Sequence, residues 1–233
     1  MLLTLPIRDV QIATPRARLV QIDLAGQTFP YQPGQALYLA AHEHEKRRPY
    51  SIALPPEEAS RLGHLELLVG VDSDGNPGPD LRLEPGTLVD IDGPVGRFTF
   101  PEQPSERRFA FVAGGTGIAP LRAMLHRALE VPHDHIGVLY SARTRDEFAF
   151  ESELRALAGR GAIDLRLAVT RDAGAEEWSG TRGRISRADL AILVQGPDTL
   201  CFVCGPQGLV HEIPRQLAEI GIPPERIKVE EWG

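Results

Sequence analysis

The stretch Val112–Leu125, VAGGTGIAPLRAML, places a glycine run between two different sequence patterns. The residues before the run, FAFVA (109–113), form a short apolar segment typical of a buried parallel strand. The residues after it, PLRAMLHRAL (120–129), carry apolar side chains at helical spacing. A strand, a glycine turn and a helix in this order predict a parallel sheet with crossover helices. The run itself either binds a phosphate or only turns the chain.

The rest of the chain divides into two halves with different patterns. HIGVLYSA (135–142) leads into EFAFESELRALAG (147–159), and LCFVCGP (200–206) leads into LVHEIPRQLAEIG (209–221), so strands alternate with helices. The first hundred residues instead show short β-rich runs broken by turn-forming residues, which is typical of an antiparallel barrel. We therefore predict an antiparallel β-barrel domain in residues 1–103 and a Rossmann-like α/β domain with a parallel sheet in residues 104–233.

Composition excludes several classes of protein. The 233 residues are 42% apolar and 24% charged, which is usual for a soluble globular protein. The net charge of −7 argues against nucleic acid as a partner. No apolar run is long enough to span a membrane and no signal peptide is evident, so we predict a cytoplasmic protein without membrane insertion. Two cysteines are too few for a four-thiolate iron–sulfur cluster.

The glycine run Gly114–Gly117 is expected at a helix N-terminus, where backbone N–H groups and the helix dipole attract an anion. Pro120 fits an early helical position because its missing N–H costs nothing there. As a dinucleotide fingerprint the run is incomplete, since a third glycine is expected where Pro120 stands. Taken alone, the run fits a phosphate site and a plain tight turn equally well.

The segment RRPYSIA (47–53) combines residue types that suit a nucleotide cofactor. The guanidinium of Arg48 can bind a phosphate, the ring of Tyr50 can stack on a planar heterocycle, and Ser51 can hydrogen-bond a ring nitrogen. In a strand, Arg48 and Tyr50 share one face and Ser51 lies on the other. In isolation, a surface arginine beside a core tyrosine explains the segment more simply.

The segment VCGPQGLV (203–210) is a further junction of a strand, a glycine turn and a helix. Residues three apart in a strand face opposite sides, so Cys201 and Cys204 should neither form a disulfide nor chelate a metal together. Cys201 is then a core residue. Cys204 ends a parallel strand, which is where open α/β sheets bind ligands.

Two histidine-containing loops are weaker candidates. HEHEKRR (42–48) and PHDH (132–135) offer His-x-His spacings without a third or fourth ligand, so we predict no metal site. The adjacent cations Lys46 and Arg47 fit either a docking patch for an acidic electron carrier or a solvated loop.

Taken together and in this order, the three segments resemble the ferredoxin–NADP reductase family over essentially the whole chain. Arg48-Pro49-Tyr50-Ser51 matches the flavin-binding Arg-x-Tyr-Ser motif. Gly114 to Pro120 matches the pyridine-nucleotide phosphate loop, and Cys204-Gly205-Pro206 matches the nicotinamide-side Cys-Gly-Pro motif. The ending Glu230-Glu231-Trp232-Gly233 is similar to the terminal Glu-x-aromatic of the family.

The resemblance implies a FAD-binding barrel in residues 1–103 and an NAD(P)-binding domain in residues 104–233. Arg48 would bind the flavin phosphate, Tyr50 would stack on the isoalloxazine, and Ser51 would bond near flavin N5. Gly75 to Pro79 replace the Gly-x-x-Ser turn of the family. Because Gly78 stands where a serine or threonine is expected, FMN remains an alternative to FAD. The full cofactor-binding set is Arg48, Pro49, Tyr50, Ser51, Val69, Gly75, Gly78, Pro79, Gly114, Gly115, Thr116, Gly117, Pro120, Arg143, Thr170, Arg171, Cys204, Gly205 and Pro206.

The same resemblance implies four catalytic residues. Cys204 would pack beside the reacting nicotinamide carbon, and Ser51 and Glu230 would tune the flavin or relay a proton. Trp232 would cover the flavin face and move aside during turnover.

The activity implied is that of an enzyme, an NAD(P)H-dependent flavoprotein oxidoreductase. It would take hydride onto bound flavin and pass electrons to a separate iron–sulfur or haem protein. Two alternatives stay open, a flavin reductase that releases free reduced flavin and an electron-transfer subunit or non-catalytic nucleotide-binding module of a larger complex. Arg143 and Thr170-Arg171 favour NADPH, because an arginine fork fits a 2′-phosphate. Asp146 and Asp172 would instead favour NADH.

Overall fold

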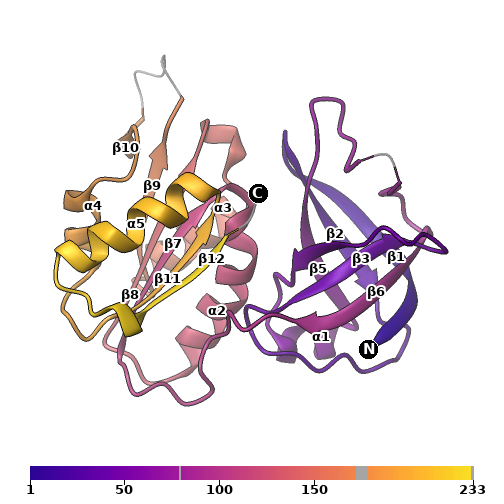
Figure 1. Ribbon diagram of the computed structural model, residues 1–233, viewed down its shortest axis with the longest axis horizontal. Helices are drawn as coiled ribbons and strands as arrows, with labels where there is room; N and C mark the ends of the chain where they lie inside the picture. The colour runs from indigo at the N-terminus through magenta and orange to yellow at the C-terminus, as the bar shows by residue number, and fades with distance from the viewer. Residues whose placement is uncertain (79, 172–177, 232–233) are drawn as a thin grey trace. The chain divides into compact units, whose positions relative to one another are not determined.

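The structure is a computed structural model that describes residues 1–78, 80–171 and 178–231 and divides into two compact units (Figure 1). The first unit comprises Met1–Phe100 together with Arg122–Arg127. The second comprises Pro101–Leu121 and Ala128–Gly233. Each unit contains one six-stranded sheet.

The sheet of the first unit is antiparallel, with the strand order β4-β3-β6-β1-β2-β5. A bridge between Ile52 and Leu67 links the residue after β4 to β5, so the two ends of this order meet and the sheet closes on itself. A short helix, α1 (Pro56–Leu62), precedes β5 and ends at Gly63. The strands are β1 (Leu2–Thr14), β2 (Ala17–Asp23), β3 (Ala36–Ala41), β4 (Arg48–Ser51), β5 (His64–Gly70) and β6 (Leu88–Val95).

Alternating burial explains why these segments form a closed sheet. In β6, Val89 and Ile91 are fully buried while the residues between them are half-buried. Val20 and Ile22 of β2 show the same alternation. In these two strands one face fills the interior and the other lies nearer the solvent, as a period of two predicts, whereas β5 is buried on both faces from His64 to Val69.

The sheet of the second unit is parallel, with the order β10-β9-β8-β7-β11-β12. Helices α4 and α5 contribute Leu190, Leu193, Val210, Ile213 and Leu217 to one core cluster with β7 and β11, and α3 packs against β9. The strands are β7 (Arg108–Gly114), β8 (His135–Ala142), β9 (Asp164–Val169), β10 (Thr181–Arg182), β11 (Leu200–Gly205) and β12 (Ile227–Glu231). The helices are α2 (Ile118–Glu130), α3 (Glu151–Gly159), α4 (Arg187–Leu193) and α5 (Gln207–Glu219), with 3₁₀ turns η1 (Gly115–Gly117), η2 (Arg145–Glu147) and η3 (Pro224–Arg226).

Residues 122–127 in the middle of α2 belong to the first unit, where Arg122 forms a buried ion pair with Glu66. Arg122 donates from Nη1 to the Ala53 carbonyl and to the Glu66 carboxylate, both at 3.0 Å. Gln21 donates to the other oxygen of Glu66 at 3.1 Å. The buried carboxylate is therefore compensated by a charge and by hydrogen bonds, as burial requires.

The predicted fold class, an antiparallel barrel followed by a parallel α/β domain, is confirmed. The patterns in the sequence do not predict α1, α4, β10 or β12. The apolar spacing predicts a helix from residue 147, whereas α3 begins at Glu151. Phe148 is buried against Tyr140 and Phe150 takes a φ of 59°, so the chain cannot be helical between η2 and α3.

Of the helices described, none is both long and apolar enough to cross a membrane.

Candidate functional site

In the first unit, β4 carries the Arg-x-Tyr-Ser motif, and exposure decreases along the strand. Arg48 is exposed, Tyr50 is half-buried and Ser51 is buried. Nη1 of Arg48 donates to the Pro77 carbonyl at 2.8 Å, which ties β4 to the turn that precedes β6. Burial raises the pKa of the Tyr50 hydroxyl and Arg48 opposes that rise, so this ring stays neutral beside a cation.

The hydroxyl of Ser51 is a buried polar group without a hydrogen-bond partner among the described residues. Leaving such a group unpaired costs about 1–3 kcal/mol. A ligand atom that accepts or donates one hydrogen bond at Ser51 would remove this cost. A flavin ring nitrogen has that property, so the residue fits the cofactor that the motif predicts.

The turn after β5 is built by an aspartate and two glycines. The carboxylate of Asp72 accepts the N–H groups of Asp74 at 3.0 Å and Asn76 at 2.8 Å, and these bonds hold its pKa below the ordinary value. Gly75 and Gly78 have φ values of +84° and +124°, which other residues rarely adopt.

This turn forms a cradle against Arg48. A Cβ on Gly78 would lie 2.7 Å from Nη1 of Arg48, so a serine or threonine there would require the guanidinium to move. The glycine at the position where the family carries a hydroxyl therefore leaves room for the guanidinium of Arg48, which can bind a phosphate. Pro79 lies outside the described residues.

In the second unit, two of the loop glycines allow close packing. A Cβ on Gly117 would lie 2.4 Å from the Cys204 carbonyl oxygen. A Cβ on Gly114 would lie 2.8 Å from Cδ of Pro206. The phosphate loop and the Cys-Gly-Pro motif are thus in direct contact, and only glycine permits that approach.

The rest of the loop is open. Gly115, at a φ of +56°, and Thr116 are exposed, and nothing lies within 4 Å of a Cβ built on Gly115. The buried Tyr140 hydroxyl donates to the Gly115 carbonyl at 2.9 Å and accepts the Ala149 N–H. Among the residues that the structure describes, no side chain caps the N-terminus of α2, in whose first turn Pro120 lies. The Tyr140 hydroxyl therefore anchors the loop, and the positive end of the helix stays available to an anion.

Cys204 is buried at the end of β11, in register with Glu230 of β12. Burial, together with the charge of Glu230, raises the pKa of this thiol well above 9.0. Burial also raises the pKa of the Cys201 thiol to about 12. Both cysteines are free, in agreement with the strand geometry that separates them. Trp232, the fourth predicted catalytic residue, lies outside the described residues.

The predicted coenzyme-selecting residues extend two neighbouring strands. Beyond the ladder of β8 and β9, Thr170 donates its N–H to the Ala142 carbonyl at 3.0 Å and Arg171 donates to the Arg143 carbonyl at 2.8 Å. Both arginines are exposed. The backbone therefore places Arg143 and Arg171 side by side at the carboxyl edge of the parallel sheet.

Two acidic residues, Asp146 and Asp172, are the alternative that would favour NADH. The Asp146 carboxylate accepts the hydroxyl of Thr144, so it is already engaged within its own turn. Asp172 lies outside the described residues.

Val69, another predicted binding residue, is fully buried in β5 opposite Arg18 of β2.

Lys46 and Arg47, which could form a docking patch, are each paired with an acidic side chain. Lys46 lies 3.6 Å from Asp80, and Arg47 lies 2.8 Å from Asp92. This neutralisation favours the solvated-loop interpretation.

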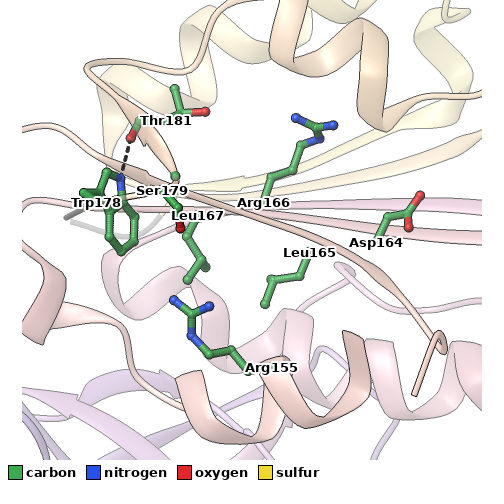
Figure 2. Close-up of a pocket in the computed structure, with 9 residues that line it drawn as sticks. Arg155, Asp164, Leu165, Arg166, Leu167, Trp178, Ser179 and Thr181 are labelled. Atoms are coloured by element: carbon green, nitrogen blue, oxygen red, sulfur yellow. Dashed lines mark hydrogen bonds between the residues drawn. The ribbon is translucent and has the colours of Figure 1, made fainter. Parts of the chain in front are cut away.

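A pocket of about 530 Å³ lies along β9 and was not anticipated from the sequence. The indole of Trp178 donates to the Thr181 carbonyl, and the side chain of Arg166 points away from the Arg155 guanidinium (Figure 2). Arg155 is itself paired with Glu151 at 2.7 Å. The pocket contains none of the predicted site residues, and its two cations do not converge on one point.

These arrangements define a class of protein. A buried unpaired serine and a glycine cradle on an antiparallel barrel suit a flavin, and an uncapped helix after a glycine loop suits a pyridine nucleotide. Residues 6–100 match the oxidoreductase FAD-binding domain, and residues 111–214 match the oxidoreductase NAD-binding domain. The protein is an NAD(P)H-dependent flavoprotein reductase with FAD as its cofactor.

Within that class, the chain belongs to the ferredoxin–NADP reductase family. It is 33% identical to ferredoxin–NADP reductase B of Sorangium cellulosum, over 96% of this chain and 94% of that protein. It is 30% identical to an NADH-cytochrome b5 reductase-like protein of Arabidopsis thaliana, over 71% of this chain, and the match spans 51% of that longer protein. The predicted family, enzyme class and cofactors are thereby confirmed.

Solved structures share the fold. The flavohaem-like FAD/NAD-binding domain of nitric oxide dioxygenase from Vibrio cholerae superposes with a TM-score of 0.82 at 23% identity, covering 99% of this chain and 98% of that one. A ferredoxin NADP⁺ reductase from Neisseria gonorrhoeae, solved with FAD and NADP, gives 0.79 at 20% identity and covers 99% and 98%.

Proposed function

We propose that this enzyme passes electrons from NAD(P)H through FAD to a separate iron–sulfur or haem protein. The observation that carries the proposal is the cysteine inventory. The sequence holds two cysteines, and both are buried, free thiols. Because a cysteine-ligated iron–sulfur cluster needs four thiolates, a cluster that accepts the electrons lies outside these 233 residues. Names among the relatives, ferredoxin–NADP reductase and cytochrome b5 reductase, support both acceptor types.

In this proposal the first domain, residues 1–103, holds the flavin. Bound FAD supplies the capacity to accept a hydride and to release electrons one at a time. Arg48 binds the flavin-side phosphate, and the backbone of Gly75 to Gly78 lines the pyrophosphate. Tyr50 stacks on the ring system, and the buried hydroxyl of Ser51 hydrogen-bonds near N5.

The second domain, residues 104–233, holds the nicotinamide coenzyme. The exposed loop residues Gly115 and Thr116 and the uncapped α2 bind its pyrophosphate. Cys204 presents a neutral thiol to the nicotinamide and excludes water from the reacting carbon. Glu230 tunes the flavin or relays a proton, and Trp232 would cover the flavin face and move aside during turnover.

For the coenzyme we propose NADPH over NADH. Arg143 and Arg171 lie on adjacent backbone segments joined by a 2.8 Å hydrogen bond, and both are exposed. Two guanidinium groups at one edge suit the compact dianion of a 2′-phosphate.

The test is a spectrum of the purified protein before and after anaerobic addition of NADPH, followed by an acceptor. We expect a bound-flavin spectrum that survives gel filtration, bleaches with NADPH and recovers on adding oxidised ferredoxin or cytochrome b5. A colourless protein that reduces only added flavin would replace the proposal with the flavin-reductase alternative. A flavin that no pyridine nucleotide bleaches would leave a non-catalytic module.

A further inference from the structure

A second arginine, Arg18, lies against the same glycine turn as Arg48. Arg18 belongs to β2, where it pairs in register with Val69 of β5. Its Nη1 donates to the carbonyls of Thr14 at 3.3 Å and Ala17 at 3.2 Å, which fixes the direction of the side chain. Its Nη2 lies 2.8 Å from the position that a Cβ on Gly75 would take.

The turn is therefore flanked by two guanidinium groups, each over a glycine with positive φ. Arg18 lies at Gly75 and Arg48 at Gly78. Three peptide units separate these glycines, so their Cα atoms are at most about 11 Å apart. Replacing either glycine by a residue with a side chain would push a guanidinium away from the turn.

Among the described residues, neither of these two guanidinium groups is paired with a carboxylate. Neither Arg18 nor Arg48 makes an ion pair with a carboxylate in the described part of the chain, whereas the neighbouring Lys46 and Arg47 do. The Asp72 carboxylate is directed to N–H groups of its own turn. Two guanidinium groups without a carboxylate partner, next to a half-buried glycine turn, suit a ligand with two linked phosphates.

We propose that Arg18 binds the adenosine-side phosphate of FAD and makes the site select FAD over FMN. The inference rests on the proposed role of Arg48 and the Gly75–Gly78 turn in holding the flavin-side phosphate, which FAD and FMN share. Gly78 removes the hydroxyl donor that the family pattern carries at this turn. Arg18 supplies replacement donors at the Gly75 end of the turn, to the phosphate that only FAD has.

The test compares flavin affinities of the holoprotein and its variants. Protein purified with excess FAD or excess FMN is diluted, and the flavin fluorescence recovered on dilution yields Kd for each flavin. The variants are Arg18→Met, Arg18→Lys, Arg48→Met and, as a matched control, Arg16→Met. Arg16 is exposed two residues from Arg18.

We expect Arg18→Met to weaken FAD binding by about tenfold or more, the loss of one charge-assisted contact, and to leave FMN binding within about twofold. Arg18→Lys should restore part of the FAD affinity, Arg48→Met should weaken both flavins, and Arg16→Met should change neither. Unchanged FMN binding in Arg18→Met also shows that the barrel is intact.

Two results would overturn the inference while leaving the flavin function standing. One is a wild-type protein that binds FMN as tightly as FAD. The other is an Arg18→Met variant with an unaltered ratio of FAD to FMN affinity. A wild-type protein that binds neither flavin would instead reject the proposed function itself.

Discussion

Cys204 lies directly opposite Glu230 in the parallel pairing of β11 with β12. The thiol is fully buried, and burial with the neighbouring carboxylate keeps its pKa well above 9.0. A thiol in this state is a small, polarisable contact surface and a poor nucleophile. The proposed role of Cys204 is therefore to position the nicotinamide by packing.

Replacing this contact should slow hydride transfer without loss of flavin. Cys204→Ala should lower the single-turnover rate of flavin bleaching by about tenfold or more, because a misplaced ring is costly in the reacting complex. The control is Cys201→Ala, which removes a buried thiol from the core cluster of α4 and α5 and should leave the rate unchanged. A normal rate in Cys204→Ala, or equal slowing in both variants, would count against the assignment.

Because folding raises the pKa values of both thiols, the free energy of unfolding varies with pH in the alkaline range. An unfolded cysteine loses its proton near pH 9.0, whereas folded Cys201 keeps it to about pH 12. The folded protein therefore binds more protons in this interval, and its free energy of unfolding falls as pH rises. Per thiol, the slope is at most about 1.4 kcal/mol per pH unit.

Cys201→Ala isolates that slope. Denaturant unfolding between pH 9 and pH 12 should show a shallower decline for the variant than for the wild type. Tyr31 and Tyr140, whose pKa values burial also raises, contribute to both proteins and cancel in the comparison. Identical slopes would show that the folded thiol ionises freely.

Gly117 should tolerate no side chain. A Cβ there would lie 2.4 Å from the Cys204 carbonyl, and backbone cannot yield as a flexible side chain can. We expect Gly117→Ala to destabilise the protein by about 1–3 kcal/mol, as overpacking does, and to weaken coenzyme binding. Gly208→Ala, in the first turn of α5 with nothing within 4 Å, should be neutral in thermal unfolding and coenzyme titration.

Arg48 should govern flavin retention. Arg48→Ala should weaken flavin binding by about 1.5–3 kcal/mol if the guanidinium makes a charge-assisted bond to phosphate. Flavin released on dialysis measures the effect, and Arg47→Ala is the control because Arg47 is already paired with Asp92. Equal retention in Arg48→Ala and wild type would reject the role.

Arg171 should determine the preference for NADPH over NADH. Arg171→Ala should lower kcat/KM for NADPH by about tenfold or more and leave NADH little affected, since only NADPH carries the 2′-phosphate. Arg143→Ala should act in the same direction because its backbone lies beside that of Arg171. Arg160→Ala, an exposed arginine after α3, serves as the control. An equal loss with both coenzymes would remove Arg171 from the site.

Local sequence was sufficient for the strand, glycine turn and helix units and for the separation of the two cysteines. Each of these depends on residues close together in the chain, so hydrophobic period and turn chemistry reveal them. The Arg-x-Tyr-Ser, glycine-loop and Cys-Gly-Pro motifs are local in the same sense. The family could therefore be identified from the sequence before the fold was known.

Tertiary structure alone decided how distant segments meet. The pairing of Glu230 with Cys204 depends on β12 adding to the edge of β11, and the short segment Ile227–Glu231 has no distinctive period. In the sequence, Arg18 looks like an ordinary strand residue, and only the fold places its guanidinium at the Gly75 turn. Contacts between residues this far apart in the chain arise from packing, which no local pattern encodes.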